Sequence, residues 1–260
     1  MNASAFIRSV LAAGAVAIAS LARAAPDAQA ILAASDAVRN PSKPFAVVTT
    51  LIEYRSGKQT DGNTLSVYSK ADPHSGQYRS LIRFVAPPRD ANKLMLKNGN
   101  ELWFFDPASQ ASIRISPQQR LLGQAANGDV LTVNLAKDYT AELQGDEDVV
   151  DGERVSRHSH KLDLAAASPD VTYHRIEMWV DAASSRPVKA RFFAESGRLL
   201  KTAYYRKFAP QLGRERPTEV VIIDGLDPQW VTVIRYSEFA WRDVPDAWLQ
   251  RDYLPRFKPE

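Results

Sequence analysis

Hydrophobic and polar positions alternate in short runs along most of this chain, and one run departs from the alternation. Leu102, Trp103, Phe104 and Phe105 are four consecutive large apolar residues between an Asn-Gly turn and an Asp-Pro turn. A turn-bounded aromatic run of this length predicts an extended strand. Because side chains alternate across a strand, Leu102 and Phe104 face one side of a sheet and Trp103 and Phe105 the other. Both sides must therefore be covered.

Other strand patterns surround this run, separated by turn signals such as Asp-Gly and Ser-Gly. A spacing near ten residues is typical of an all-β sandwich or barrel and not of βαβ units. A polar hairpin loop is predicted between Ser56 and Gly62. The predicted strands are residues 45–55, 65–70, 77–85, 93–96, 139–150, 152–164, 172–181, 187–195, 198–208, 217–224 and 230–241.

Two helices are predicted at the ends of this strand region. Residues 27–40 begin at Asp27, a suitable N-cap, and end before an Asn-Pro step. The tail, residues 245–257, carries Trp248, Leu249, Tyr253 and Leu254 at helical spacing. We expect it to pack a final helix onto the sheet.

Residues 117–134 are the least strand-like part of the mature chain. Small residues are frequent here, and Asp129 is a suitable cap for a short helix up to Leu135. Long irregular segments in a compact domain are usually lids, binding loops or disordered. We interpret this one as a lid over the mouth of a cavity, and a passive surface loop is the alternative.

Residues 1–24 have the pattern of a secretory signal peptide. Arg8 precedes an apolar run that is short for a membrane span, and Ala22-Arg23-Ala24 forms an A-x-A cleavage site. We expect a mature chain of residues 25–260, exported, soluble and organised as one domain. The chain contains no cysteine, which leaves no disulfide and no acylated residue near the cleavage site.

Composition and charge argue against nucleic-acid binding. The 260 residues are 45% hydrophobic and 24% charged, as in ordinary globular proteins. The formal charge of +3 falls to +1 when Arg8 and Arg23 leave with the leader, so no electrostatic footprint for nucleic acid is expected.

No pattern of catalytic or metal-binding residues stands out. His158 and His160 share one face of a predicted strand and His174 lies on a later one, but an exposed histidine pair is the plainer interpretation. There is no G-x-S-x-G elbow, no cysteine nucleophile and no glycine-rich phosphate loop. The acidic run at Asp146 occupies a polar turn region. We therefore predict no enzyme activity, no cofactor and no metal.

The central run also carries a family resemblance. The string NGNELWFFDP, followed by Gln110, Ala111 and Arg114-Ile115, resembles the corresponding stretch of the periplasmic carrier LolA. It is more similar still to the LolA-like group of outer-membrane lipoprotein-sorting proteins. The strict match covers about ten residues, and the order of strands after a leader and a first helix resembles the group along most of the mature chain.

This resemblance implies a mainly β (α+β) fold: a single curved antiparallel half-barrel sheet with the N-terminal helix and a helical lid, residues 117–135, on its concave side. It implies a non-catalytic periplasmic carrier that shields acyl chains of a lipoprotein or lipid during transfer toward the outer membrane. Partners would be those acyl chains, an inner-membrane exporter and, transiently, a membrane surface. The expected cavity lining is Ile82, Phe84, Leu94, Leu96, Trp103, Phe105, Met178 and Phe192.

One departure from the family pattern is informative. The resemblance implies an arginine on an early strand that holds the lid closed. The corresponding residues of this chain are Lys70-Ala71-Asp72-Pro73, so this arginine is missing. Arg79 and Arg83 are candidate substitutes. Two other functions stay open: a periplasmic envelope-stress sensing module that binds lipid or lipoprotein, and an envelope hydrolase with an unrecognised site.

Overall fold

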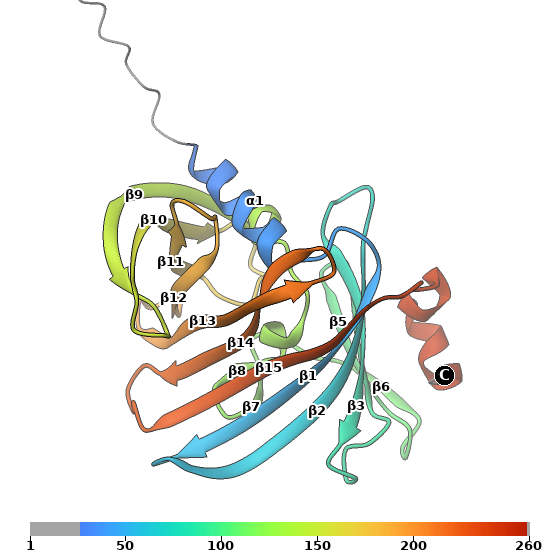
Figure 1. The fold of residues 1–260 in the computed structure, drawn as a ribbon. Coiled ribbons are helices and arrows are strands. Elements are labelled where there is room, and N and C mark those ends of the chain that lie inside the picture. The colour runs from blue at the N-terminus through green and yellow to red at the C-terminus, as the bar shows by residue number, and fades with distance from the viewer. Residues whose placement is uncertain (1–26, 259–260) are drawn as a thin grey trace, which may run out of the picture.

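The computed structural model describes residues 27–258 of the chain (Figure 1). The predicted signal peptide, residues 1–24, lies outside the described residues. The chain begins with a helix, continues through two runs of strands separated by an irregular segment, and ends in two short helices. The helices are α1 (Ala28–Arg39), α2 (Leu135–Asp138) and the 3-10 helices η1 (Asn127–Val130), η2 (Asp246–Leu249) and η3 (Arg251–Arg256).

The strands form one large antiparallel sheet and one small ribbon. The thirteen strands of the large sheet lie in the order β6-β5-β4-β3-β2-β1-β15-β14-β13-β12-β11-β10-β9, and β7 pairs with β8. The first run is β1 (Phe45–Arg55), β2 (Lys58–Ala71), β3 (Tyr78–Ala86), β4 (Leu94–Asn98), β5 (Glu101–Asp106) and β6 (Ala111–Arg114). The ribbon strands β7 (Arg120–Leu122) and β8 (Ala125–Ala126) lie in the irregular segment that follows. The second run is β9 (Tyr139–Val150), β10 (Ser156–Ala166), β11 (Arg175–Asp181), β12 (Pro187–Phe193), β13 (Leu199–Gln211), β14 (Arg214–Asp224) and β15 (Trp230–Trp241).

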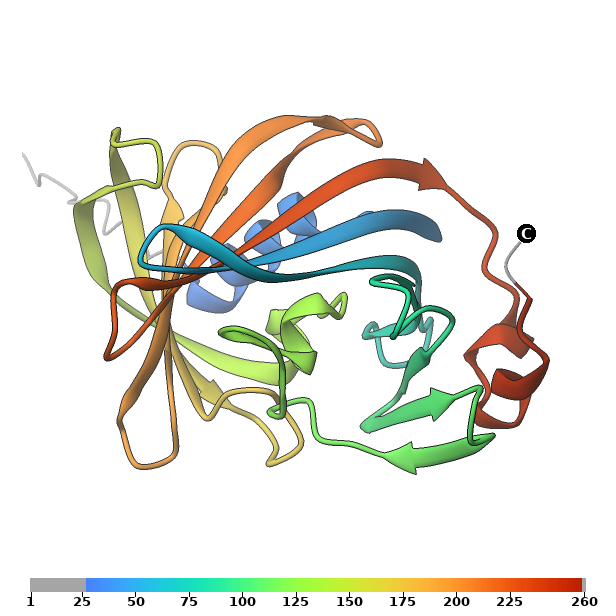
Figure 2. The same ribbon diagram turned by 90° about the horizontal axis from the view of Figure 1, so that it is seen from below.

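This strand order gives a curved sheet that does not close. Each run is a meander of neighbouring strands, and pairing of β1 with β15 joins the two meanders in the middle. The sheet arches over α1 and over the irregular segment, while the C-terminal helices lie outside the arch (Figure 2). The predicted half-barrel, with a helix and the 117–135 segment on its concave side, is confirmed.

Most predicted elements are found at the predicted places. The strands at 45–55, 139–150 and 230–241 have the predicted bounds, and α1 begins after Asp27, whose side chain accepts a hydrogen bond from the Gln29 N–H at 2.9 Å. Two local predictions are wrong. The hairpin loop after β1 is shorter, because β2 already begins at Lys58. Asp129 lies inside η1 and does not begin a helix up to Leu135, because the chain is extended at Leu131.

Strand β5 is buried on both faces, as its sequence predicts. Leu102 and Phe104 face the concave core, while Trp103 and Phe105 face a second, convex cluster. In this convex cluster, Trp248 packs edge-on against Tyr68, with ring centroids 5.5 Å apart. The cluster is formed by Leu81, Leu94, Leu96, Phe105, Val244, Trp248, Leu249 and Leu254. The C-terminal helices thus cover the convex face of β3 to β5.

Candidate functional site

The irregular stretch of residues 117–138, here called the covering segment, lies inside the curve of the sheet. It contains β7, β8, η1 and α2, and residues 122–128 are all buried. Gly123 takes a positive φ of 53° and approaches β1 and β15 so closely that a Cβ would lie 2.3 Å from the Thr232 hydroxyl. The segment therefore packs against the sheet and is not a passive surface loop.

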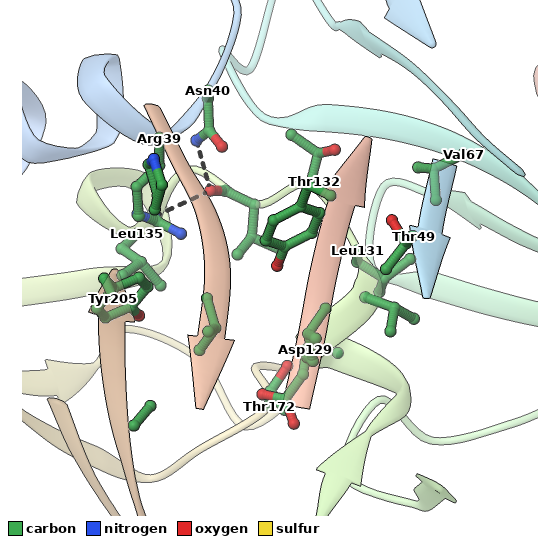
Figure 3. Close-up of a pocket in the computed structure, with 18 of the residues that line it drawn as sticks. Arg39, Asn40, Thr49, Val67, Asp129, Leu131, Thr132, Leu135, Thr172 and Tyr205 are labelled. Carbon is green, nitrogen blue, oxygen red and sulfur yellow. Dashed lines mark hydrogen bonds between the residues drawn. The ribbon is translucent and has the colours of Figure 1, made fainter. Parts of the chain in front are cut away.

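One end of the covering segment is held by polar contacts with α1 and its neighbours. Arg39 and Asn40 both donate to the Val133 carbonyl, at 3.4 and 2.8 Å (Figure 3). The Asp36 carboxylate accepts from the Ala136 N–H at 2.7 Å, and Arg39 also pairs with Asp36. Burial alone would lower the pKa of Arg39, but the Asp36 carboxylate raises it overall, so the guanidinium stays charged.

Side chains of β2 and of the turn before β3 add to this attachment. The Ser69 and Thr132 hydroxyls lie 2.8 Å apart, so a hydroxyl of β2 contacts the covering segment directly. Gln77 donates to the Asn134 carbonyl at 3.1 Å and accepts from the Asn134 N–H at 2.7 Å. Arg39, Ser69 and Gln77, from three different elements, therefore hold residues 132–134 of the segment.

The middle of the covering segment is anchored through Asp129. Its carboxylate pairs with Lys201, a residue of β13 that is only 3% exposed, and accepts from the Tyr173 hydroxyl at 2.8 Å. Burial lowers the pKa of Lys201, and the Asp129 carboxylate opposes that shift. Burial and the same carboxylate raise the pKa of Tyr173 well above its ordinary value, so its hydroxyl remains a donor at neutral pH.

A cavity of about 150 Å³ lies between the covering segment and the concave face. Its walls come from both meanders, from the end of α1 and from η1 to α2 (Figure 3). The apolar part of the wall includes Val47, Val67, Ile176, Phe192, Ala203 and Ile222.

The polar part of the wall consists mainly of phenols and hydroxyls. Thr49, Tyr205 and Tyr236 all contribute to it. Burial raises the pKa of both tyrosines, so their hydroxyls stay protonated and uncharged. The cavity thus presents an apolar surface with several neutral hydroxyls, and its charged lining residues are Arg39, Asp129 and Asp138.

The predicted lining residues divide between the two faces of the sheet. Phe192 lines the cavity, and Ile82, Phe84 and Met178 belong to the concave core around it without reaching the cavity wall. The other four predicted residues do not lie on the concave face, so the prediction is wrong for them. Leu94, Leu96 and Phe105 are buried in the convex cluster, and Trp103 packs against it, because the side chains of β4 and β5 that face the concave side are those of the alternate positions.

Arg79 and Arg83 do not replace the missing family arginine. Arg79 pairs with Asp246 of η2 at 2.6 Å and lies 3.7 Å from Asp72, and Arg83 donates to Asn92 at 3.4 Å. Both alternate with the concave residues Ile82 and Phe84 along β3, so they point away from the covering segment. Sequence reasoning missed Arg39 and Lys201 because their partners lie 94 and 72 residues away.

The predicted pair of histidines, His158 and His160, contacts acids on the edge of the sheet. His158 lies 3.0 Å from Asp148 and His160 lies 2.6 Å from Asp146, between β10 and β9. Within residues 27–258, no group of three or more His, Cys, Asp or Glu side chains is arranged to hold a metal ion. Among the same residues, no helix has the length and apolar content that crossing a membrane requires.

Comparison with known proteins places the whole architecture in a known group. A family model described as an uncharacterized protein matches residues 76–256. The structure is similar to that of a LolA superfamily protein from Nitrosomonas europaea, with a TM-score of 0.78 and 34% identity over 88% of this chain and 100% of that one. No curated protein matches the sequence.

Two more distant structures share the fold. One is a DUF1329 family protein from Desulfovibrio piger, with a TM-score of 0.73 and 21% identity over 87% of this chain and 97% of that one. The other is a domain from Vibrio parahaemolyticus assigned as an outer membrane lipoprotein-sorting protein, with a TM-score of 0.73 and 16% identity over 88% and 98% of the two chains. At these identities the likeness concerns the fold alone.

Proposed function

We propose that this chain, which belongs to the LolA superfamily, is a periplasmic carrier that shields acyl chains of a lipoprotein or another lipid from water. Burial of each methylene contributes about 0.8 kcal/mol and needs no directional contact, so an apolar wall is sufficient for binding. No catalytic step belongs to this proposal. The observation that carries it is the cavity enclosed between the concave face and the covering segment.

The size of the cavity suggests how binding would occur. A volume of about 150 Å³ is below the range of roughly 300–1,000 Å³ found for ligand pockets. A long acyl chain therefore requires the covering segment to move outward. The part of the segment that borders the cavity is held by hydrogen bonds and by Asp129, and its apolar residues Leu131 and Leu135 line the cavity. In this proposal the guest covers the apolar surface that such a movement exposes.

The acyl chain would contact the apolar wall that the structure gives and not the full predicted set. Val47, Val67, Ile176, Phe192, Ala203 and Ile222 are the proposed contacts. Of the predicted residues, Ile82, Phe84 and Met178 would support this wall from the surrounding core.

The cellular setting is part of the proposal. Residues 1–24 would direct export and be removed, and residues 25–260 would act as one soluble, non-lipidated domain. Transfer would proceed toward the outer membrane, with an inner-membrane exporter and a membrane surface as transient partners. The lipoprotein-sorting assignment of the Vibrio parahaemolyticus domain supports this setting.

Native mass spectrometry of the protein purified from the periplasm tests the proposal. We expect acyl-bearing species to copurify and to be released when the protein is denatured. A stable protein partner without lipid would instead favour the sensing module, and the absence of both would favour the hydrolase. Either of these two results would overturn the carrier.

A further inference from the structure

A second pocket lies on the other side of the Asp129 anchor, at the open end of the sheet. It has a volume of about 500 Å³, which is within the range of roughly 300–1,000 Å³ for ligand pockets. We call it the outer pocket. It is lined by the start of β13, the turn between β14 and β15, the end of β1 and the β7–β8 hairpin, with Arg55, Arg120, Gln124, Arg198 and Trp230 among its residues.

Two of its arginines have no counter-charge. Within residues 27–258, neither Arg120 nor Arg198 forms an ion pair. Arg55 does, because it lies 3.2 Å from Glu53 and 3.9 Å from Asp227. The other acid of the pocket, Asp224, accepts from the backbone N–H groups of Leu226 and Asp227 at 2.9 and 2.7 Å. Arg120 and Arg198 are therefore available for an anion.

A buried amide points to the same kind of ligand. Gln124 is only 8% exposed, and its side-chain nitrogen has no hydrogen-bond partner among the described residues. A buried donor left without a partner costs roughly 1–3 kcal/mol. The backbone around it is fully engaged, since the Gln124 N–H donates to the Thr232 hydroxyl at 2.8 Å and its carbonyl accepts from Lys201 at 3.1 Å. An acceptor in the pocket would satisfy this amide.

Trp230 gives the pocket a rigid wall. The guanidinium carbons of Arg55 and Arg120 lie 3.2 and 4.5 Å from its ring centre, and its Nε1 donates to Glu53 at 2.7 Å. Cation–π contacts of this kind hold a guanidinium in place while its N–H groups remain free to donate. Arg120 is thus held at the pocket without losing its hydrogen-bonding capacity.

The outer pocket and the central cavity share a wall. Tyr173 lines both, with Asp129 on the cavity side and Lys201 on the outer side. Asp129 belongs to the part of the covering segment that borders the cavity. An outward movement of this part would remove a piece of the wall, while the β7–β8 hairpin, which carries Arg120 and Gln124, stays packed on Thr232. An apolar space and an anion-receptive pocket would then be continuous.

We propose that the outer pocket binds the anionic head group of an amphiphile whose acyl chain occupies the central cavity, with Arg120, Arg198 and the Gln124 amide as donors. The cargo class is then an acyl chain joined to a phosphate or a similar anion. This inference rests on the carrier function proposed above. Charge-assisted hydrogen bonds from arginine to a phosphate are the strongest that a site of this composition offers.

The test compares two ligands that differ only in the head group. The affinities of lysophosphatidic acid and of a monoacylglycerol with the same acyl chain are measured by isothermal titration calorimetry on the full mature protein. We expect the phosphate-bearing ligand to bind at least about tenfold more tightly, the effect of one charge-assisted hydrogen bond. In the variant R120Q/R198Q this affinity ratio should fall close to one. The control R114Q/R154Q removes two exposed arginines elsewhere and should keep the ratio.

Other outcomes separate this inference from the carrier function. Equal binding of both ligands by the unaltered protein, or an unchanged ratio in R120Q/R198Q, overturns the head-group site and leaves the carrier intact. Binding of neither ligand overturns the carrier as well. Binding of inorganic phosphate without either amphiphile would assign the pocket to a free anion and contradict the proposed cargo. Thermal unfolding of both double variants checks that they fold.

Discussion

The two faces of the sheet are both apolar, and each is covered by a different segment of the chain. The two covers are attached in different ways. On the convex face, Trp248 of the C-terminal segment packs edge-on against Tyr68 and Phe257, and Leu249 and Leu254 are almost completely buried. On the concave face, the covering segment also buries Leu122, Leu131 and Leu135, but it leaves a cavity and is held in addition by hydrogen bonds and one buried ion pair.

This difference indicates that the cover of the convex face is permanent. Interdigitated apolar side chains lose contacts as soon as they separate, so the convex cover contributes to global stability. Where the covering segment borders the cavity, its side chains are not interdigitated with the sheet, and its hydrogen bonds can be exchanged for bonds to water at a small net cost. A cover of the second kind is suited to repeated opening. Substitutions on the two faces should therefore have separable effects on stability and on binding.

The largest effect is expected for Leu96→Ala on the convex face. Leu96 is fully buried between its cross-strand neighbours Leu81 and Trp103. Truncation of such a leucine costs about 2–5 kcal/mol of the free energy of unfolding. Chemical denaturation measures this loss. Acyl-chain affinity should not change, and a loss of affinity at an unchanged stability would contradict the division between the faces.

A more local effect is expected for Asp129→Asn. The amide keeps an acceptor for Tyr173 and Lys201 but leaves the buried ammonium without a counter-charge. Removal of one partner of a buried ion pair costs up to about 3–5 kcal/mol, and release of the Lys201 proton, which burial favours by lowering the pKa, limits this cost. Hydrogen exchange should become faster in residues 117–138 and remain slow in β3 to β5. The control Asp148→Asn, at an exposed position on β9, should leave the segment protected. Uniformly faster exchange would show that the segment does not open independently.

The smallest effect concerns a charged part of the convex face, which the C-terminal helices do not cover. Glu219 lies 3.1, 2.8 and 2.9 Å from Arg206, Lys207 and Arg235. Burial would raise the pKa of Glu219, but hydrogen bonds from Lys207 and Arg235 lower it overall, below its ordinary value of 4.5.

A depressed carboxyl pKa stabilises the folded protein above pH 4.5, and this contribution is lost as the pH falls through the folded-state pKa. Unfolding of the protein should therefore show a loss of stability below pH 4.5 that is reduced in Glu219→Gln. Identical pH profiles for the two proteins would exclude this role of Glu219.

Much of the fold follows from local sequence patterns. The turn residues give the strand bounds, and the run from Leu102 to Phe105 predicts a strand that is covered on both sides. Such patterns involve only residues that are close together in the sequence, so a single sequence is sufficient to recognise them and no alignment is needed. The half-barrel shape was predicted from the resemblance of the same run to the LolA family.

The site could not be predicted equally well, because alternation along a strand separates two faces without saying which is concave. Leu94, Met95 and Leu96 are all buried, and only the structure assigns Met95 to the concave core and its neighbours to the convex cluster. The anchor of Asp129 with Lys201 joins residues that lie 72 positions apart. No local pattern marks either residue as part of a pair.

The most direct test of the carrier function replaces each of two neighbouring alanines by leucine. Only one of the two alanines lines the cavity. Ala203 lines the cavity, while its cross-strand partner Ala190 is buried in the same core without lining it. Titration of a fluorescent fatty-acyl probe should show that Ala203→Leu weakens binding about tenfold, as expected if about two methylenes at roughly 0.8 kcal/mol each are displaced. Ala190→Leu should bind as the unaltered protein does. Equal affinity of the two variants would contradict the carrier function of the cavity.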